Sequence, residues 1–361
     1  MSTFSGIIDL ILGNVKSRVL DLDPFNERDH EQIWQWNRNE PKSIPGCVHE
    51  YVYRQVLSSP EKQAVSSWDG DFTYAELDRL SNKLAYHLCQ LGVRPEVLVP
   101  HCFDKSKWST VTTLAIMKAG GGSVGLSPTH PVERLRAIIE SCNSKVVVSA
   151  HQHVDLFSGI VDTTIDFTPE FIARLPDMPA SFTLPHVAPE NTVFVSFTSG
   201  STGKPKGIVL QHKSLITSIQ AHGNEWNVGP ESRVIQFSAY AFDASMSDTY
   251  TTLVLGGTVC IPSEADRLNN LAGAINKLSV NWAFLTPRLI NTLSPKSVPG
   301  LKHIVLGGEA IKPEDIDPWI NKVALRLVYG LVLVPYLSQK FQIEQRDGEP
   351  LQVASKAVAP K

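Results

Sequence analysis

The feature that most constrains this chain is a stretch rich in glycine and hydroxyl groups between two short apolar runs. It reads Ser-Phe-Thr-Ser-Gly-Ser-Thr-Gly-Lys-Pro-Lys-Gly over residues 196–207, after the apolar residues 193–195 and before 208–210. Both apolar runs are typical of buried strands. Glycines let a backbone turn sharply and approach a bulky anion, while free N–H groups, hydroxyls and lysines donate hydrogen bonds to phosphate oxygens. The stretch therefore indicates a loop that holds a polyphosphate.

A flexible, solvated Gly/Ser loop is the alternative interpretation of the same stretch. The flanking strands and the lysines at its end favour phosphate binding instead. The P-loop pattern G-x-x-x-x-G-K-[ST] does not fit, because Pro205 follows Lys204 and no glycine lies five residues before Gly203. The residues expected to hold the phosphates are Thr198, Ser199, Gly200, Ser201, Thr202, Gly203, Lys204, Lys206 and Gly207.

Over this length the string closely resembles the phosphate loop of adenylate-forming enzymes. These include acyl-CoA synthetases, luciferases and the adenylation domains of nonribosomal peptide synthetases. The resemblance implies ATP and Mg²⁺ as cofactors, and an α/β fold of largely parallel sheets sandwiched by helices, the N-terminal domain of that superfamily. The alternation of strands and helices from His49 onward favours the same class. The string Ile-Trp-Gln-Trp-Asn at 33–37 also looks like the connector after a condensation domain in fungal peptide synthetases.

The composition limits the size of the core, the classes of binding partner and the cellular compartment that we expect. With 361 residues, of which 42% are hydrophobic and 19% charged, the chain is large enough for more than one core. A net charge of −3 gives no electrostatic reason to expect nucleic acid or an anionic membrane as a partner. The five cysteines are scattered without a C-x-x-C pair, as in a reduced cytosolic protein. Because no apolar run reaches membrane length, we expect a cytoplasmic protein.

The chain is expected to consist of three segments. Residues 1–45 form an N-terminal arm or linker, an extended segment laid on a larger body through Trp34 and Trp36. Residues 46–330 form a partial adenylation domain, and residues 331–361 form an unrelated C-terminal tail.

Several local patterns give further expectations. Thr73 and Glu76 have the spacing of a capping box at the start of a helix. Residues 151–190 contain several prolines and no strong period, which predicts an irregular surface connection. Residues 253–262 predict a strand, and a helix is expected near 268–278.

A carboxylate among aromatic neighbours marks the next motif, Tyr-Ala-Phe-Asp-Ala-Ser at 240–245. A buried aspartate is costly unless it is paired. Asp243 is either a helix cap or turn residue, or the partner of a substrate ammonium. Phe-Asp-x-Ser resembles the fourth motif of peptide-synthetase adenylation domains, whose aspartate binds the amino group of an α-amino acid. The resemblance therefore favours amino-acid activation over acyl-CoA synthesis, whose substrate has no ammonium.

The run His-Ile-Val-Leu-Gly-Gly-Glu-Ala at 303–310 predicts a strand, a tight turn and the start of a helix. A plain turn is one interpretation. The family places this Gly-Gly-Glu segment against adenine, so the resemblance implies that the adenosine contacts Gly307, Gly308, Glu309 and Tyr329. Carried over position by position, the walls of the amino-acid pocket are Ala244, Ser247, Phe284, Val305, Gly307 and Val328. They are mostly small or apolar, which hints at an uncharged and bulky substrate side chain.

The resemblance ends at Gly330. In the family, Tyr-Gly continues into Pro-Thr-Glu, whose threonine contacts phosphate and whose glutamate helps to hold Mg²⁺; here it continues into Leu-Val-Leu-Val-Pro. Nothing in 331–361 resembles the later ribose-binding aspartate, the hinge or the C-terminal domain with its catalytic lysine, so no catalytic or metal-binding residue is assigned. A change of reading frame or a retained intron after Gly330 would produce such a sequence. Because losing one transition-state charge contact costs roughly 10²–10³ in rate, we expect negligible adenylation by this chain alone.

Three functions are consistent with the sequence. The first is an amino-acid-activating ligase, or a fragment of one, in the peptide-synthetase biosynthesis of a secondary metabolite. Its partners would be an amino-acid substrate and carrier proteins or other synthetase modules. The second is an acyl- or aryl-CoA ligase, against which Asp243 argues. The third is a non-catalytic remnant that binds nucleotide.

Overall fold

A computed structural model of the chain describes residues 3–13, 18, 23, 25–36, 38, 43–199, 205–328, 339–343 and 353–357. The chain divides into two compact units. One unit is Ser43–Pro335, and the other combines Met1–Lys42 with Tyr336–Lys361. The segment boundaries expected from the sequence, at 45/46 and 330/331, stay predictions. The site lies in the larger unit.

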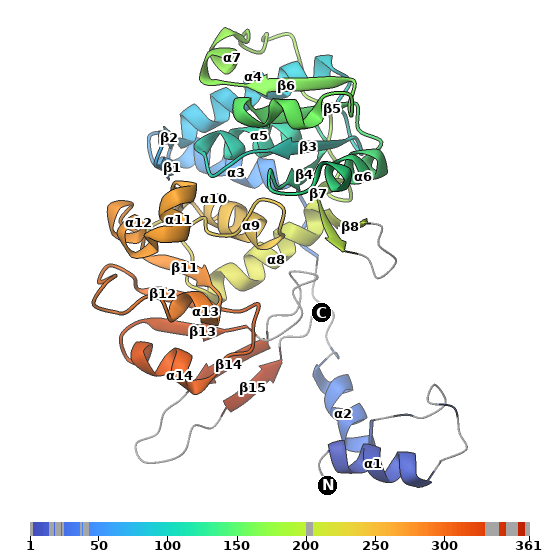
Figure 1. Ribbon diagram of the computed structural model, residues 1–361, viewed down its shortest axis with the longest axis vertical. Coiled ribbons are helices and arrows are strands. Elements are labelled where there is room, and N and C mark those ends of the chain that lie inside the picture. Colours follow the sequence, from blue (N-terminus) through green and yellow to red (C-terminus); the bar gives the residue numbers. More distant parts are fainter. Residues whose placement is uncertain are drawn as a thin grey trace. The chain divides into compact units, whose positions relative to one another are not determined.

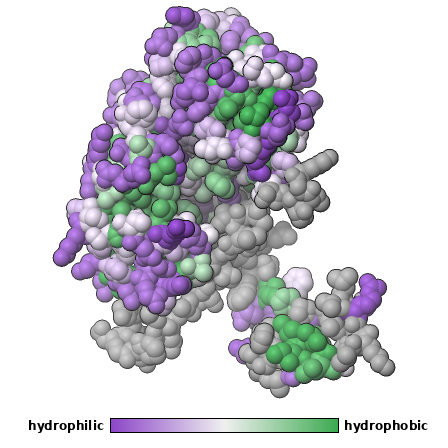
Figure 2. All heavy atoms as spheres, viewed as in Figure 1, coloured by the Kyte–Doolittle hydropathy of each residue, from purple (hydrophilic) through white to green (hydrophobic). Residues whose placement is uncertain are grey.

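The smaller unit contains two helices and a strand pair among its described residues. Their bounds are α1 (Thr3–Gly13), α2 (Glu27–Trp36), β14 (Gln339–Ile343) and β15 (Val353–Ala357), with the two strands antiparallel. Apolar side chains gather on α1 (Figure 2), where Ile8, Ile11 and Leu12 are exposed.

The extended conformation expected around Trp34 and Trp36 is wrong, since both residues lie in α2. The physical reason is a cap at the start of that helix. The Asp29 N–H donates to Asn26 Oδ1 at 2.9 Å, and the Asn26 N–H donates back to Asp29 Oδ2 at 3.4 Å. This reciprocal pair satisfies N–H groups that a helix would otherwise leave without partners.

The first sheet of the larger unit has the strand order β13-β12-β11-β9-β10-β1-β2. Neighbouring strands pair in parallel except β1 and β2, which form the antiparallel hairpin that the turn Asp69-Gly70-Asp71 predicts from the sequence. The bounds are β1 (Gln63–Ser67), β2 (Gly70–Thr73), β9 (Arg233–Ile235), β10 (Thr258–Ile261), β11 (Trp282–Leu285), β12 (His303–Leu306) and β13 (Ala324–Leu327).

The second sheet has the order β6-β5-β3-β4-β7-β8 and is parallel except for the β7–β8 pair. Its strands are β3 (Leu98–Cys102), β4 (Gly122–Leu126), β5 (Val146–Ala150), β6 (Thr163–Phe167), β7 (Thr192–Ser199) and β8 (Pro205–Gln211). Every residue of β5 is buried, as is typical of a strand in a sheet that is covered on both faces. The expectation of an α/β fold with largely parallel sheets is confirmed.

The core lies where the two sheets face each other across helices (Figure 1). Helix α5 (Lys107–Lys118) contacts β3 and β4 of one sheet and β1 and β2 of the other. All its residues from 109 to 118 are buried. A helix that is buried all round must be enclosed by apolar layers, which explains its weak amphipathic pattern. Helix α5 therefore forms a layer between the two sheets, as one part of the expected arrangement of sheets covered by helices.

The other helices of the larger unit cover these sheets and connect their strands. The longer ones are α3 (Val48–Ser58), α4 (Tyr74–Gln90), α6 (Val132–Cys142), α8 (His212–Glu225) and α12 (Leu271–Lys277). The short ones are η2 (His151–Phe157), α7 (Pro169–Arg174), α9 (Ala244–Met246), η3 (Ser247–Thr251), α10 (Thr252–Val254), α11 (Glu264–Asn269), α13 (Pro287–Ile290), α14 (Pro313–Ile316) and η4 (Asp317–Trp319). No helix among the described residues is long and apolar enough to span a membrane.

The capping box at the start of α4 is confirmed. The Glu76 N–H donates to Thr73 Oγ1 at 3.1 Å, and the Thr73 N–H donates to Glu76 Oε2 at 2.8 Å. The irregular connection expected over 151–190 is wrong for 151–174, where η2, β6 and α7 lie, and correct for 175–190, which contain no helix or strand. The signal was present in β6, where buried Ile165 and Phe167 alternate with more exposed residues, the period of a half-buried strand.

Two further expectations need correction. The strand expected over 253–262 is confined to β10, because Leu253 and Val254 are helical and Gly256, at φ +79°, then turns the chain. The helix expected near 268–278 is broken at Asn270, whose side chain accepts a hydrogen bond from the Gly273 N–H at 3.2 Å and so begins α12.

Buried histidines should make the fold sensitive to acid. Burial lowers the pKa of His101, His212 and His222 to about 4, from an ordinary value of 6.5. Between those pH values the unfolded chain binds more protons than the folded chain. The stabilising contribution is therefore complete above pH 6.5 and is lost as the pH falls toward 4. We expect the free energy of unfolding to fall by up to about 1.4 kcal/mol per pH unit for each histidine, as measured by urea denaturation.

The matched variant for this test is His101→Phe, which keeps the ring contacts with Phe103 and Tyr240. Its unfolding free energy should depend less steeply on pH than that of the unmodified chain. His151→Phe is the control, because the His151 side chain is exposed. Equal slopes for His101→Phe and the unmodified chain would contradict the prediction.

The approach of β4 to the chain after β9 leaves no room for a side chain at Gly125. A Cβ there would lie 1.9 Å from the Tyr240 carbonyl oxygen, so the backbone would have to move. We expect Gly125→Ala to lower the free energy of unfolding by about 1–3 kcal/mol. Gly229→Ala is the control, because a Cβ there meets nothing within 4 Å. Equal melting temperatures for the two variants would refute this packing argument.

Candidate functional site

The expected phosphate loop is the tip of the β7–β8 hairpin. Thr198 pairs with Lys206 and Ser199 with Pro205, and Thr198 Oγ1 donates to the Lys206 carbonyl oxygen at 3.5 Å. Lys206 and Gly207 belong to β8 and are exposed. The remaining expected phosphate ligands lie outside the described residues: Gly200, Ser201, Thr202, Gly203 and Lys204. The two flanking strands are antiparallel neighbours, so the hairpin brings both ends of the loop together.

The hairpin lies against the segment that carries Asp243. Ser196 Oγ of β7 donates to the Ala241 carbonyl oxygen at 3.5 Å. On the neighbouring strand β4, Gly125 approaches the Tyr240 carbonyl as closely as a glycine allows. The structure therefore brings the expected phosphate site and the expected ammonium partner into one region.

Asp243 is partly buried and begins helix α9. Its Oδ1 accepts a hydrogen bond from the Ala244 N–H at 2.9 Å, so the helix-cap interpretation of this residue is correct. Burial raises the pKa of the Asp243 carboxyl above its ordinary value, while hydrogen bonds from backbone N–H groups oppose that rise. No cationic side chain among the described residues forms an ion pair with it. A partly desolvated carboxylate without a cation favours binding a charged amine.

Four of the expected pocket residues meet at the carboxyl ends of β11–β13. Phe284 pairs with Val305 across β11 and β12, and the Val328 N–H donates to the Leu306 carbonyl oxygen at 2.7 Å. A Cβ on Gly307 would lie 3.2 Å from both the Phe284 ring and Val328 Cβ. The absence of a side chain at Gly307 therefore lets these apolar groups approach one another. Ala244 and Ser247 follow Asp243 on a separate element, α9 and η3.

The Gly-Gly-Glu segment forms a loop between β12 and α14. Gly308 has φ +85°, and both Gly308 and Glu309 are exposed. Glu309 Oε2 accepts a hydrogen bond from the Arg288 N–H at 3.2 Å in the first turn of α13. The helix start expected directly after Glu309 is wrong. Helix α14 begins only at Pro313, a residue suited to the first turn of a helix. Tyr329 lies outside the described residues.

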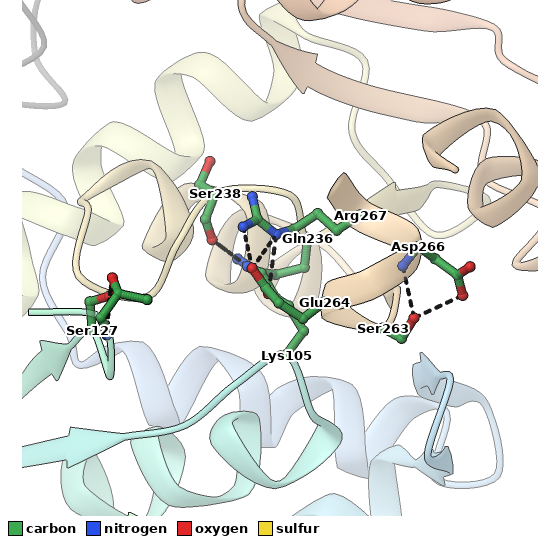
Figure 3. A network of polar contacts seen from close by, with 9 residues as sticks. Lys105, Ser127, Gln236, Ser238, Ser263, Glu264, Asp266 and Arg267 are labelled. Atoms are coloured by element: carbon green, nitrogen blue, oxygen red, sulfur yellow. Dashed lines mark hydrogen bonds and ion pairs between the residues drawn. The ribbon is translucent and has the colours of Figure 1, made fainter. Parts of the chain in front are cut away.

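Sequence reasoning did not identify a buried polar network around Lys105 (Figure 3). The Lys105 side chain, from the turn after β3, donates to Gln236 Oε1 and to the Ser238 carbonyl oxygen, each at 2.5 Å. The Ser238 N–H donates to Asp248 Oδ2 at 3.1 Å. Lys105 and Asp248 are each 2% exposed. The available signal was Asp248 itself, a second carboxylate five residues after Asp243 in an otherwise uncharged run.

Burial opposes the charge on both members of this pair. It lowers the pKa of Lys105 and raises the pKa of Asp248, while the attraction between the two charges acts in the opposite direction on each. The Lys105 ammonium also lies 4.5 Å from the centre of the Tyr240 ring, within the range of a cation–π interaction. The network therefore surrounds the ammonium with acceptors that all come from the chain between β9 and η3.

Comparisons with known proteins agree on one family for this chain. The family model described as AMP-binding enzyme matches residues 52–331. Nonribosomal peptide synthetase atnA of Emericella nidulans is 48% identical over 318 residues, which is 88% of this chain and 4% of that protein. Nonribosomal peptide synthetase 1 of Aspergillus fumigatus is 42% identical over 325 residues, 90% of this chain and 5% of that protein. The chain thus spans a small part of the length of these relatives.

Solved structures agree in fold at low sequence identity. The nonribosomal peptide synthetase FmoA3, bound to α-methyl-L-serine-AMP, has a TM-score of 0.76 at 20% identity, covering 99% of this chain and 45% of that one. VinN in complex with 3-methylaspartate has a TM-score of 0.71 at 17% identity, covering 81% and 80% of the two chains. Given the family match and the fungal relatives, this chain belongs to the AMP-binding enzyme family and is related to the adenylation domains of fungal nonribosomal peptide synthetases.

Proposed function

We propose that the chain recognises an α-amino acid together with ATP, as the substrate-binding part of an amino-acid-adenylating enzyme. The observation that carries this proposal is the carboxylate of Asp243. It is partly buried, forms no ion pair among the described residues, and lies on a segment held against the phosphate hairpin through Ser196. A substrate ammonium would supply the missing charge.

Each expected site residue has a role in this proposal. Asp243 binds the substrate ammonium. The triphosphate is held by Thr198, Ser199, Gly200, Ser201, Thr202, Gly203, Lys204, Lys206 and Gly207. The adenosine lies against Gly307, Gly308, Glu309 and Tyr329. The substrate side chain contacts Ala244, Ser247, Phe284, Val305, Gly307 and Val328. Because the described members of this last set are apolar or small, we propose an uncharged substrate side chain.

The reaction of such an enzyme joins the amino-acid carboxylate to the α-phosphorus of ATP. A carboxylate oxygen forms the new bond, and the bond to the bridging oxygen of pyrophosphate breaks. The protein contributes mainly positioning and neutralisation of phosphate charge. Asp243 would orient the amino acid, and the hairpin would orient the phosphates. Exposed Gly308, at positive φ, leaves a stretch of backbone without a side chain against which a flat base fits.

Mg²⁺ would neutralise charge on the phosphates when bound. Among the described residues, no group of three or more His, Cys, Asp or Glu side chains could hold a metal ion. Mg²⁺ usually binds through one or two carboxylates and the substrate phosphates, so such a group is not required. The proposal assigns no residue of this chain to the metal.

The partners are proposed from the relatives. Carrier proteins and other peptide-synthetase modules would receive the activated amino acid, in the synthesis of a secondary metabolite. The relatives named above are many times longer than this chain. Their complete activities are therefore not attributed to it.

We expect the 361-residue chain to bind its substrates without appreciable turnover. After Gly330 the sequence departs from the motif whose threonine and glutamate the family uses on phosphate and Mg²⁺. The measurement is amino-acid-dependent exchange of labelled pyrophosphate into ATP, run beside titration with a non-hydrolysable ATP analogue. Binding of the analogue with exchange at background would support the proposal. Exchange above background with any amino acid would refute the expected inactivity, and exchange with fatty or aryl acids alone would favour an acyl- or aryl-CoA ligase.

The role of Asp243 is tested by Asp243→Asn. Asparagine keeps the acceptor that caps α9, so this change removes the charge and not the cap. We expect the affinity for the amino acid to fall roughly 10- to 100-fold, while the affinity for the same acid without its amino group is unchanged. Asp243→Ala, which removes both charge and cap, should in addition lower the melting temperature. Equal amino-acid affinity for Asp243→Asn and the unmodified chain would rule out the ammonium role.

A further inference from the structure

The segment that carries Asp243 has little regular structure of its own. Residues 236–243 run between the end of β9 and the start of α9. Among the described residues, one backbone hydrogen bond has both partners in this segment. It runs from the Phe242 N–H to the Ala239 carbonyl oxygen and closes a turn. Its conformation must therefore be fixed by contacts with other elements.

Lys105 supplies those contacts from the other sheet. It follows β3, whereas Gln236 follows β9, so its hydrogen bonds connect the two sheets. The Gln236 Nε2 group donates to the same Ser238 carbonyl oxygen at 2.8 Å. The ammonium lies over the Tyr240 ring, and the Tyr240 hydroxyl donates to the carbonyl oxygen of Ser106, next to Lys105, at 3.2 Å.

Asp248 contacts the same segment at Ser238. Its carboxylate accepts the Ser238 N–H, while Ser238's carbonyl oxygen accepts from Lys105. Ser238 therefore joins two buried and opposite charges through its backbone. Asp248 belongs to η3, which continues directly from the short helix that Asp243 caps. A displacement of Lys105 would move the segment at Gln236 and Ser238, before Asp243. A displacement of Asp248 would move it at Ser238 and also through η3 and α9, after Asp243.

We propose that Lys105, together with Asp248, is a positioning residue that fixes the Asp243 carboxylate for recognition of the substrate ammonium. The inference rests on the proposed function. Neither residue need touch the substrate. Two buried groups of opposite charge add little net stability compared with apolar side chains, whereas removing one of them leaves the other uncompensated. The geometry gives the pair a second role, which is to hold an irregular segment in one conformation.

Lys118 offers a matched control. It is also buried, at 6% exposure, and its ammonium also has side-chain acceptors, Asp78, Ser81 and Asn82. It is the last residue of α5, a helix about 18 Å long, whereas Lys105 lies before the first residue of that helix. Lys118→Met therefore removes a comparable buried charge without touching the segment 236–243.

The experiment compares Lys105→Met with Lys118→Met in the full chain. The probe is whichever proteinogenic amino acid most stabilises the unmodified chain against heat, with a non-hydrolysable ATP analogue as the second ligand. We expect both variants to have lower melting temperatures. Only Lys105→Met should lose amino-acid affinity, by roughly 10- to 100-fold, with affinity for the ATP analogue unchanged. Hydrogen exchange of the amides in 236–243 should speed up in Lys105→Met and not in Lys118→Met.

The outcomes separate the inference from the function on which it rests. If the unmodified chain binds no amino acid, the proposed function fails, and the recognition role of Lys105 fails with it. If the unmodified chain binds but Lys105→Met binds equally well, only the inference is overturned. Equal losses in Lys105→Met and Lys118→Met would show a general effect of stability and would also overturn it. Should Lys105→Met not fold, Asp248→Asn, which keeps an acceptor for the Ser238 N–H, gives the same comparison.

Discussion

The burial of helix α5 between two largely parallel sheets is the constraint on which the rest of the structure depends. Its residues from 109 to 118 are buried on every side, and it contacts strands of both sheets. Parallel strands have their carboxyl ends at the same edge of a sheet, and ligands of such folds bind outside that edge. The loops after β9 and β12 therefore share one edge of the first sheet, and the contacts of Gly125 and Ser196 with Tyr240 and Ala241 bring β4 and β7 of the second sheet next to the segment after β9.

The polar groups inside this apolar frame have separate consequences. Burial lowers the pKa of His101 and His212, because it disfavours their charged forms. They therefore lower the free energy of unfolding only in acid. Lys105 and Asp248 keep opposite charges near each other and share the backbone of Ser238. The histidines therefore bear on stability, whereas Lys105 and Asp248 bear on the conformation of the segment that contains Ser238.

Much of the fold was predictable because its signals are local. The capping box of Thr73, the apolar runs of the central strands and the turn of the first hairpin each depend on a few neighbouring residues. The predictions that were wrong concern elements whose formation depends on a strand partner or on a single side-chain hydrogen bond. Strand β6 has only Ile165 and Phe167 as its apolar pattern, and it forms because it pairs with β5 at the edge of a sheet. The break at Asn270 depends on one side-chain hydrogen bond, which composition alone does not indicate.

For the candidate site too, the sequence indicated some features and the structure added others. The sequence predicts the phosphate loop and the role of the Phe-Asp-x-Ser motif, because glycine, hydroxyl and carboxylate groups at fixed spacing have a specific chemistry. The sequence also indicated both interpretations of Asp243, and the structure shows that one residue can cap a helix while its charge has no ion-pair partner among the described residues.

The sequence by itself determined the class of fold and the family and predicted the type of ligand, since these depend on residue types at short spacing. Only the tertiary structure decided that Gly125 must lack a side chain and that Lys105 reaches Gln236 and Ser238. The physical reason is that each contact joins residues more than a hundred positions apart. Such contacts form only when the two sheets close around α5, and no short-range pattern specifies them.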